Sequence, residues 1–149
     1  MTPPRYRLGF TLMEAVMVLL IVATVVGALT PSVIRQIAHA RVNRAANVVA
    51  SDFYLAQSLA GRQHGPVIIT FDSTARQTTI SPPAPANTNL LTRRFGIDSE
   101  FKLTTFSATS SPIQILPNGM ANAAVTITVA SGAYTRQVRM TRAGQIRVL

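Results

Sequence analysis

The sequence contains no cysteine, so a disulfide framework and thiol chemistry are both excluded. Acidic residues are also scarce: five stand against 14 lysines and arginines, which gives a formal net charge of +9. Such an excess favours contact with acidic surfaces, phosphate or nucleic acid, and it fits a plain solvated surface equally well. Composition alone therefore does not separate a binding protein from a structural one.

No constellation of catalytic or metal-ligating residues stands out. His39 and His64 have no cysteine or convergent carboxylates at metal-ligand spacing, so both are predicted to be surface histidines. Asp72, Asp98 and Glu100 are explained by turn chemistry, and no glycine-rich phosphate loop is present. The sequence therefore predicts a protein that is not an enzyme and that holds no cofactor or metal.

A long apolar run covers residues 10–29. As a helix its 20 residues would span about 30 Å, the thickness of the hydrocarbon core of a bilayer. Arg5 and Arg7 precede the run and no acid does, so we expect a single membrane pass with the N-terminus in the cytoplasm. The run carries one carboxylate, Glu14, and an acid within a membrane costs roughly 2.5–3.5 kcal/mol, so it is expected to have a partner.

Three interpretations fit a basic leader followed by this run. An ordinary secretory signal is shorter and has only apolar residues where Glu14 stands. A plain membrane anchor gives no reason for the carboxylate. The third interpretation accounts for both features: residues 9–14, G-F-T-L-M-E, followed by the uninterrupted apolar run, resemble the class III signal of type IV prepilins and type II secretion pseudopilins.

This resemblance implies a processing site and an assembly residue. A prepilin peptidase would cut between Gly9 and Phe10 and methylate the new N-terminal Phe10, and Glu14 would become the fifth residue of the mature chain. The free α-amine has a pKa near 8 and is largely protonated at neutral pH. The resemblance implies that Glu14 pairs with the Phe10 amine of a neighbouring subunit; a glutamate that reaches the lipid interface is the alternative.

The helix is predicted to continue beyond the membrane. Pro31 follows the run, and a proline inside a helix removes a hydrogen bond and kinks the rod. Apolar residues then recur at three- and four-residue steps and form one stripe: Ile34, Ala38, Val42, Ala45, Val49, Phe53, Ala56 and Leu59. Gly61 ends this pattern and Gly65-Pro66 stops the helix, which is predicted to run from about Thr11 to about Ala60.

Strand patterns replace helical ones after residue 65. The predicted strands cover residues 67–71, 77–81, 90–95, 101–106, 113–116, 125–129, 134–141 and 146–148, and a Ser/Thr-rich connection covers 104–112. In the seventh strand, Arg136 shares a face with Tyr134, Val138 and Met140, and Arg139 lies on the other face. The expected fold class is α+β: a long N-terminal helix packed on a small antiparallel sheet, with a meander of three strands at the C-terminus.

The order of these parts narrows the resemblance. Residues 46–60, A-x-x-x-x-S-D-x-x-x-A-Q-S-L-A, and 67–72, V-I-I-T-F-D, followed by glycine-turned strands, resemble the GspH/FimT group of minor pseudopilins. The resemblance implies a pilin-like fold with a leader at 1–9, a membrane and filament-core helix at 10–30, an amphipathic helix half at 31–61 and a periplasmic β domain at 66–149. Because Asp98 and Glu100 are the only acids after Asp72, the acidic calcium loop of major pseudopilins is missing, and a minor role is expected.

Arginines gather in the last strands, at Arg136, Arg139, Arg142 and Arg147. Relatives of the FimT type are DNA-uptake pilins with a C-terminal G-R-x-R motif. This chain has Gly144-Gln145-Ile146-Arg147, so the first arginine is missing. Two interpretations stay open: contact with DNA phosphates, or a basic face that is solvated or touches another pseudopilin.

The sequence thus predicts a minor pseudopilin of a type II secretion pseudopilus, which helps protein export from the tip of a periplasmic filament. The partners implied are a prepilin peptidase, other major and minor pseudopilins, the inner-membrane assembly platform and a secreted substrate. The alternative is a DNA-binding minor type IV pilin that serves DNA uptake in competence. A third reading is a signal-anchored periplasmic domain that no prepilin peptidase processes.

Overall fold

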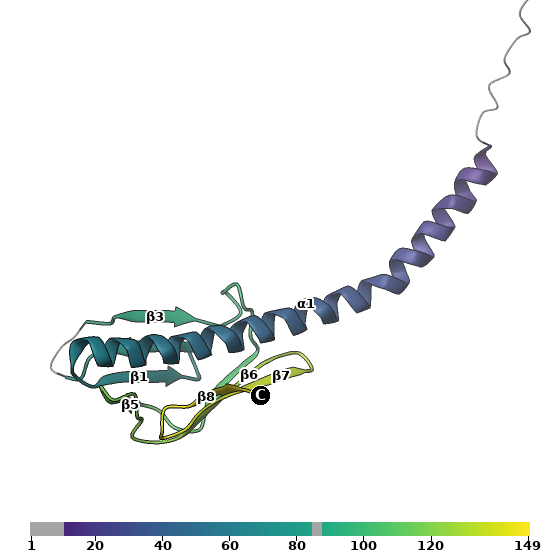
Figure 1. Ribbon diagram of the computed structural model, residues 1–149. Coiled ribbons are helices and arrows are strands. Elements are labelled where there is room, and N and C mark those ends of the chain that lie inside the picture. Colours follow the sequence, from purple (N-terminus) through teal and green to yellow (C-terminus); the bar gives the residue numbers. More distant parts are fainter. Residues whose placement is uncertain (1–10, 85–87) are drawn as a thin grey trace, which may run out of the picture. The chain divides into compact units, whose positions relative to one another are not determined.

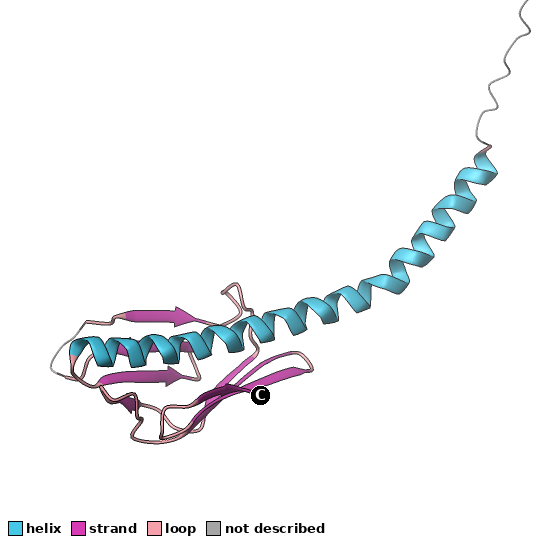
Figure 2. Ribbon diagram, in the orientation of Figure 1, coloured by secondary structure: helices cyan, strands magenta, loops and turns pink. Residues whose placement is uncertain are grey.

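The computed structural model describes residues 11–84 and 88–149. Within these residues one helix and eight strands follow one another (Figures 1 and 2). The chain divides into two compact units, Met1–Gln36 and Ile37–Leu149. The predicted cleavage site, Gly9 and Phe10, lies outside the described residues.

Helix α1 (Leu12–Gln63) begins and ends with identifiable caps. At its start the hydroxyl of Thr11 accepts the backbone N–H of Glu14 at 3.2 Å, which satisfies a free donor of the first turn. At its end His64 takes a left-handed conformation, with φ of 49°, and Gly65 N–H donates to the carbonyl of Ala60. The helix therefore ends at Gln63, a few residues beyond the predicted Ala60 and before the predicted stop at Gly65-Pro66, and its left-handed terminating residue is His64 rather than a glycine.

The helix passes Pro31 without interruption, as predicted. The kink expected there stays a prediction. In the first unit every side chain described, from residue 11 to 29 and from 32 to 36, is exposed. An 18-residue window of this helix has a mean hydropathy of 2.5, so the helix is long and apolar enough to cross a membrane.

The second unit contains two antiparallel sheets. The first has the order β3-β2-β1-β5, and its strands are β1 (Val67–Asp72), β2 (Gln77–Ser81), β3 (Leu91–Arg94) and β5 (Ile113–Ile115). The second has the order β4-β6-β7-β8, with β4 (Thr105–Ala108), β6 (Val125–Ser131), β7 (Tyr134–Met140) and β8 (Ile146–Val148). The predicted C-terminal meander is confirmed as β6-β7-β8, and the predicted small antiparallel β domain is built from two sheets.

The strand predicted over residues 101–106 was misplaced. Strand β4 starts at Thr105 and runs into the segment that was predicted to be a Ser/Thr-rich connection. Phe101 and Leu103 are instead buried on either side of Lys102, whose φ of 48° interrupts an extended chain. These two residues are apolar because they are buried in the core, although they belong to no strand.

The core connects the helix with both sheets. Phe53 of α1 lies 5.7 Å from Phe71 of β1 between ring centroids, and Phe71 lies 6.4 Å from Phe106 of β4. Phe95 then stacks on Phe106 at 5.2 Å and meets Phe101 at 5.0 Å. The buried residues of the predicted stripe are Val42, Ala45, Val49, Phe53 and Ala56. Ile34 was assigned to the stripe and is 62% exposed, because the buried part of the helix begins only at Val42.

Candidate functional sites on the helix and the β domain

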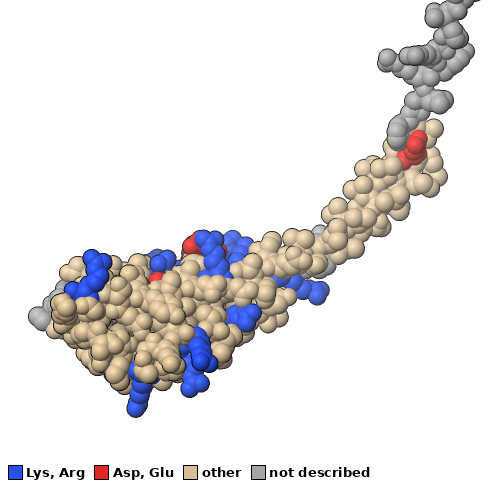
Figure 3. Space-filling view, viewed as in Figure 1, with Lys and Arg blue, Asp and Glu red and all other residues tan. Residues whose placement is uncertain are grey.

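Glu14 lies in the first turn of α1, in an otherwise uncharged stretch. Between residues 11 and 34 it is the only charged side chain in the sequence, and the surface of this helix half is almost free of blue and red in Figure 3. Within residues 11–84 and 88–149 Glu14 has no ion-pair partner. A carboxylate in this position is available to a group outside the described chain.

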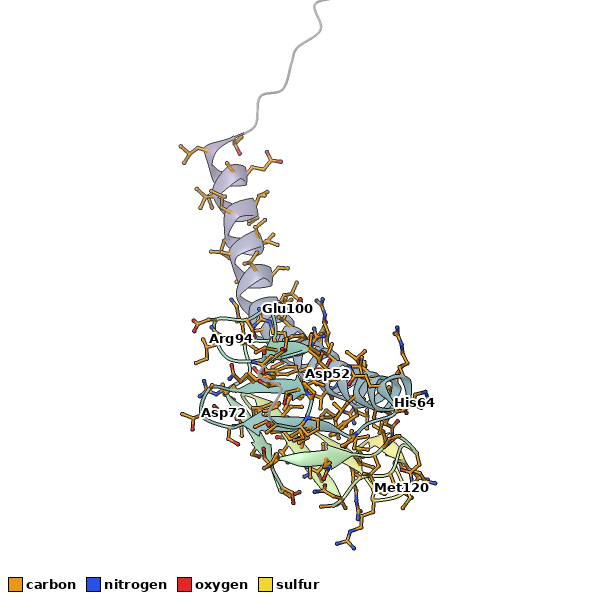
Figure 4. All side chains as sticks on the ribbon, turned by 90° about the vertical axis from the view of Figure 1, so that its left-hand side faces the viewer. Asp52, His64, Asp72, Arg94, Glu100 and Met120 are labelled. Carbon is orange, nitrogen blue, oxygen red and sulfur yellow. The ribbon has the colours of Figure 1, made fainter. Side chains whose placement is uncertain are left out.

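Asp52 forms a buried ion pair that the sequence analysis missed. Its side chain is 3% exposed, and the Arg93 Nε–H of β3 donates to both carboxylate oxygens, at 3.2 and 3.1 Å. Figure 4 labels Asp52 on the part of α1 that packs on the strands. Burial raises the pKa of Asp52, and the hydrogen bond and charge of Arg93 offset part of that rise. The pair ties the helix to the edge strand of the first sheet.

Arg136 contacts the helix from the face of β7 that it was predicted to share with Tyr134, Val138 and Met140. Its Nε–H donates to Oδ1 of Asn43 at 2.9 Å. On the same face Tyr134 meets His39 edge-on, with ring centroids 5.2 Å apart. Arg136 therefore holds β7 against α1 and does not join the other C-terminal arginines.

Arg139 and Arg147 lie directly opposite each other in the β7–β8 register, so they share the outer face of the second sheet. Both side chains are exposed, and neither forms an ion pair with any residue that the structure describes. Like charges in this position are destabilising without an anion between them. Arg142 is exposed in the turn before β8. The predicted cluster thus consists of two adjacent arginines, one in the turn and one turned inward.

Gly144, the glycine of G-Q-I-R, has a structural role. It adopts φ of 82°, and a Cβ built on it would collide with the carbonyl oxygen of Gly119. The amide nitrogen of Gln57 in α1 donates to the carbonyls of both glycines, at 3.1 Å for Gly119 and 2.8 Å for Gly144. Gln57 therefore links the turns at Gly119 and Gly144 by hydrogen bonds, and position 144 has no room for a side chain.

The two histidines do not approach acidic side chains closely enough to form a metal site. Among the residues that the structure describes, no group of three or more histidines, aspartates or glutamates could hold a metal ion. His39 contacts Tyr134 as described, and His64 is exposed at the helix end.

Comparison with known proteins identifies this arrangement. The model of the family "Type II transport protein GspH" matches residues 45–144, from the buried half of α1 to the turn before β8. A crystal structure of the type IV minor pilin FimU from Pseudomonas aeruginosa is similar, with a TM-score of 0.61, 17% identity, and coverage of 72% of this chain and 87% of FimU. A second crystal form of FimU is similar with a TM-score of 0.59 and 16% identity, and the match covers 72% of this chain and 91% of FimU. No curated protein sequence matches the chain.

The likeness to FimU shows the fold, which is that of a pilin. Pilins are structural subunits, and an apolar N-terminal helix is consistent with a membrane-anchored member of this class. The predicted α+β fold and the resemblance to the GspH/FimT group are both confirmed. The family model covers well over half of the sequence, and the chain therefore belongs to the GspH family of type II transport proteins.

Proposed function

We propose that this protein is a minor pseudopilin of a type II secretion pseudopilus. A prepilin peptidase removes residues 1–9 and methylates Phe10, and the inner-membrane platform then passes the subunit into a short periplasmic filament. There the β domain contacts other pseudopilins or the secreted substrate near the tip. The filament role is structural, and the chain supplies packing surfaces rather than catalysis.

One observation carries the proposal: helix α1 divides into two halves of different character. Residues 12–29 are apolar and exposed, with Glu14 as their only charge, whereas Val42, Val49 and Phe53 are buried in the domain's own core. A surface this apolar needs lipid or other proteins to cover it. In a subunit that moves from a bilayer into a helical filament core, this surface is covered first by lipid and then by the helices of other subunits.

The experiment that tests the proposal is the intact mass and N-terminal residue of the membrane-extracted protein, from cells with and without a prepilin peptidase. We expect loss of residues 1–9 and one methyl group on Phe10, only where the peptidase is present. An unprocessed chain, or a cut beyond Leu29, would reduce the N-terminus to an anchor or an ordinary signal and remove the filament role.

A second candidate function, DNA binding by a minor type IV pilin, is favoured by the adjacent pair Arg139 and Arg147. We expect the full chain in detergent to bind duplex DNA more weakly as salt rises, if this function holds. Replacing both arginines with glutamine should flatten the plot of log K against log salt by about two, because each phosphate contact contributes about 0.9 to the slope. Arg35→Gln with Arg62→Gln is the matched control, and absent binding at low salt would remove the candidate.

A further inference from the structure

A groove lies in the β domain where the turn between β1 and β2 meets the segment after β3. Its lining comes from residues 74–77 on one side and from Arg94 and residues 96–99 on the other, and its volume is about 630 Å³. Figure 4 shows Arg94 and Asp72, which precedes this turn, on the same side of the domain. The groove is distinct from the outer face that carries Arg139 and Arg147.

Two guanidinium groups are positioned in this groove by the backbone. Arg76 adopts φ of 48°, a conformation unusual for a residue with a side chain, and its carbonyl accepts the N–H of Phe95 at 2.7 Å. The stem of Arg76 lies against Gly96, where a Cβ would stand 3.8 Å from that of Arg76. Arg94 is opposite Gln77, the neighbour of Arg76, in the β2–β3 register, and both arginines line the groove.

Neither arginine has a counter-ion in the described chain. The ion pairs among residues 11–84 and 88–149 are Arg44–Glu100 and Arg93–Asp52. Asp98 lines the groove without pairing with either guanidinium. The groove therefore holds two positive charges and one negative charge, and a single additional carboxylate would balance it.

We propose that this groove binds an aspartate or glutamate side chain of a different protein in the filament. The proposal rests on the filament role proposed above. Guanidinium groups bind carboxylates through paired, charge-assisted hydrogen bonds, which fix orientation as well as supply energy. Asp98 makes the groove a poor match for a nucleic-acid backbone, whose successive phosphates it would repel.

A second copy of this chain is a poor source of that carboxylate, because the sequence has only five acidic residues. Asp52 is buried against Arg93, Glu100 pairs with Arg44, and Asp72 accepts the N–H groups of its own turn at 2.8 Å. Asp98 belongs to the groove itself, and Glu14 lies in the apolar helix half. Copies that have lost residues 1–9, with Arg5 and Arg7, still have 12 basic against five acidic side chains, a formal net charge of +7, and repel one another. The groove thus favours an acidic residue of a different filament subunit over one from a second copy of this chain.

The test places a photo-crosslinking amino acid at Ile97, which lines the groove and is 59% exposed, in cells that assemble the filament. We expect a crosslink to another filament subunit, mapped by mass spectrometry to a peptide with an aspartate or glutamate. Arg76→Asp with Arg94→Glu should lower the crosslink yield at least tenfold, and changing the mapped acid to arginine should restore it. Aspartate is chosen at position 76 because it tolerates positive φ.

Arg62→Glu with Lys102→Asp is the matched control, since both residues are exposed, the charge change is the same and Lys102 also has φ of 48°. An unchanged yield in the groove variant, a crosslink to a second copy or a crosslink to DNA would each overturn the proposal. A second crosslinker at Leu19 reports assembly independently. Capture of other subunits from Leu19 alone would refute only the groove, whereas failure at both positions would refute the filament role as well.

Discussion

Gly144→Ala is expected to destabilise the β domain by about 2–5 kcal/mol. A left-handed conformation costs a residue with a Cβ about 1–2 kcal/mol, and overpacking adds about 1–3 kcal/mol. Here the new methyl group would collide with the carbonyl of Gly119 and press on the amide of Gln57, 2.9 Å away. The thermal unfolding midpoint should therefore fall by roughly 10 °C in a domain of this size.

Thermal unfolding of the full chain in detergent, followed by far-ultraviolet circular dichroism, measures this effect. Gly132→Ala is the matched control, because Gly132 also has a positive φ, 61°, but open space where its Cβ would lie. Gly132→Ala should therefore lose only the stability that a left-handed conformation costs, because its methyl group meets no other atom. If both variants lose the same stability, the close approach of Gly144 and Gly119 has no energetic importance.

Glu14→Lys is expected to abolish incorporation into the filament while membrane insertion continues. In a packed core of apolar helices an unpartnered charge is far more costly than at a surface, and breaking a buried pair costs about 3–5 kcal/mol in general. Incorporation should fall at least about a hundredfold. Quantitative immunoblots of the membrane fraction and of purified filaments separate the two steps.

Glu100→Lys is the control for Glu14→Lys, because it makes the same charge change in the exposed pair with Arg44. Exposed pairs are worth about 0–1 kcal/mol, so this variant should assemble normally. Filaments that take up Glu14→Lys as readily as the control would contradict the pairing of Glu14 with the Phe10 amine that the prepilin resemblance implies.

The parts of the fold that the sequence predicted are those with local patterns. Strands β1 and β2 alternate buried and less buried side chains, and the helix stripe from Val42 to Ala56 follows a three- and four-residue step. Strand β4 was misplaced because Phe101 and Leu103 have the composition of a strand and enter the core from a turn. Local composition does not distinguish these two ways of burying an apolar side chain.

The features that were missed join residues far apart in the sequence. Asp52 and Arg93 are 41 positions apart, and Gln57 and Gly144 are 87 apart. Asp52 did carry a signal, because a carboxylate within an apolar stripe requires a partner. The identity of that partner depends on the packing of β3 against the helix, which no short motif encodes. Strand alternation did predict that Arg136 shares a face of β7 with Val138 and Met140, but its bond to Asn43 of the helix was missed and it was grouped with the exposed arginines.

The two halves of helix α1 are subject to different evolutionary pressures. The buried side chains between Val42 and Ala60 pack against the chain's own core, so we expect changes there to need compensating changes within the same gene. The side chains of residues 12–29 are exposed, so the lipids or proteins that surround them set which substitutions are tolerated. If that half packs in a filament, as proposed, we expect substitutions there to be matched by substitutions in other genes, and transfer to a foreign assembly machine to require changes in the first half but not in the domain.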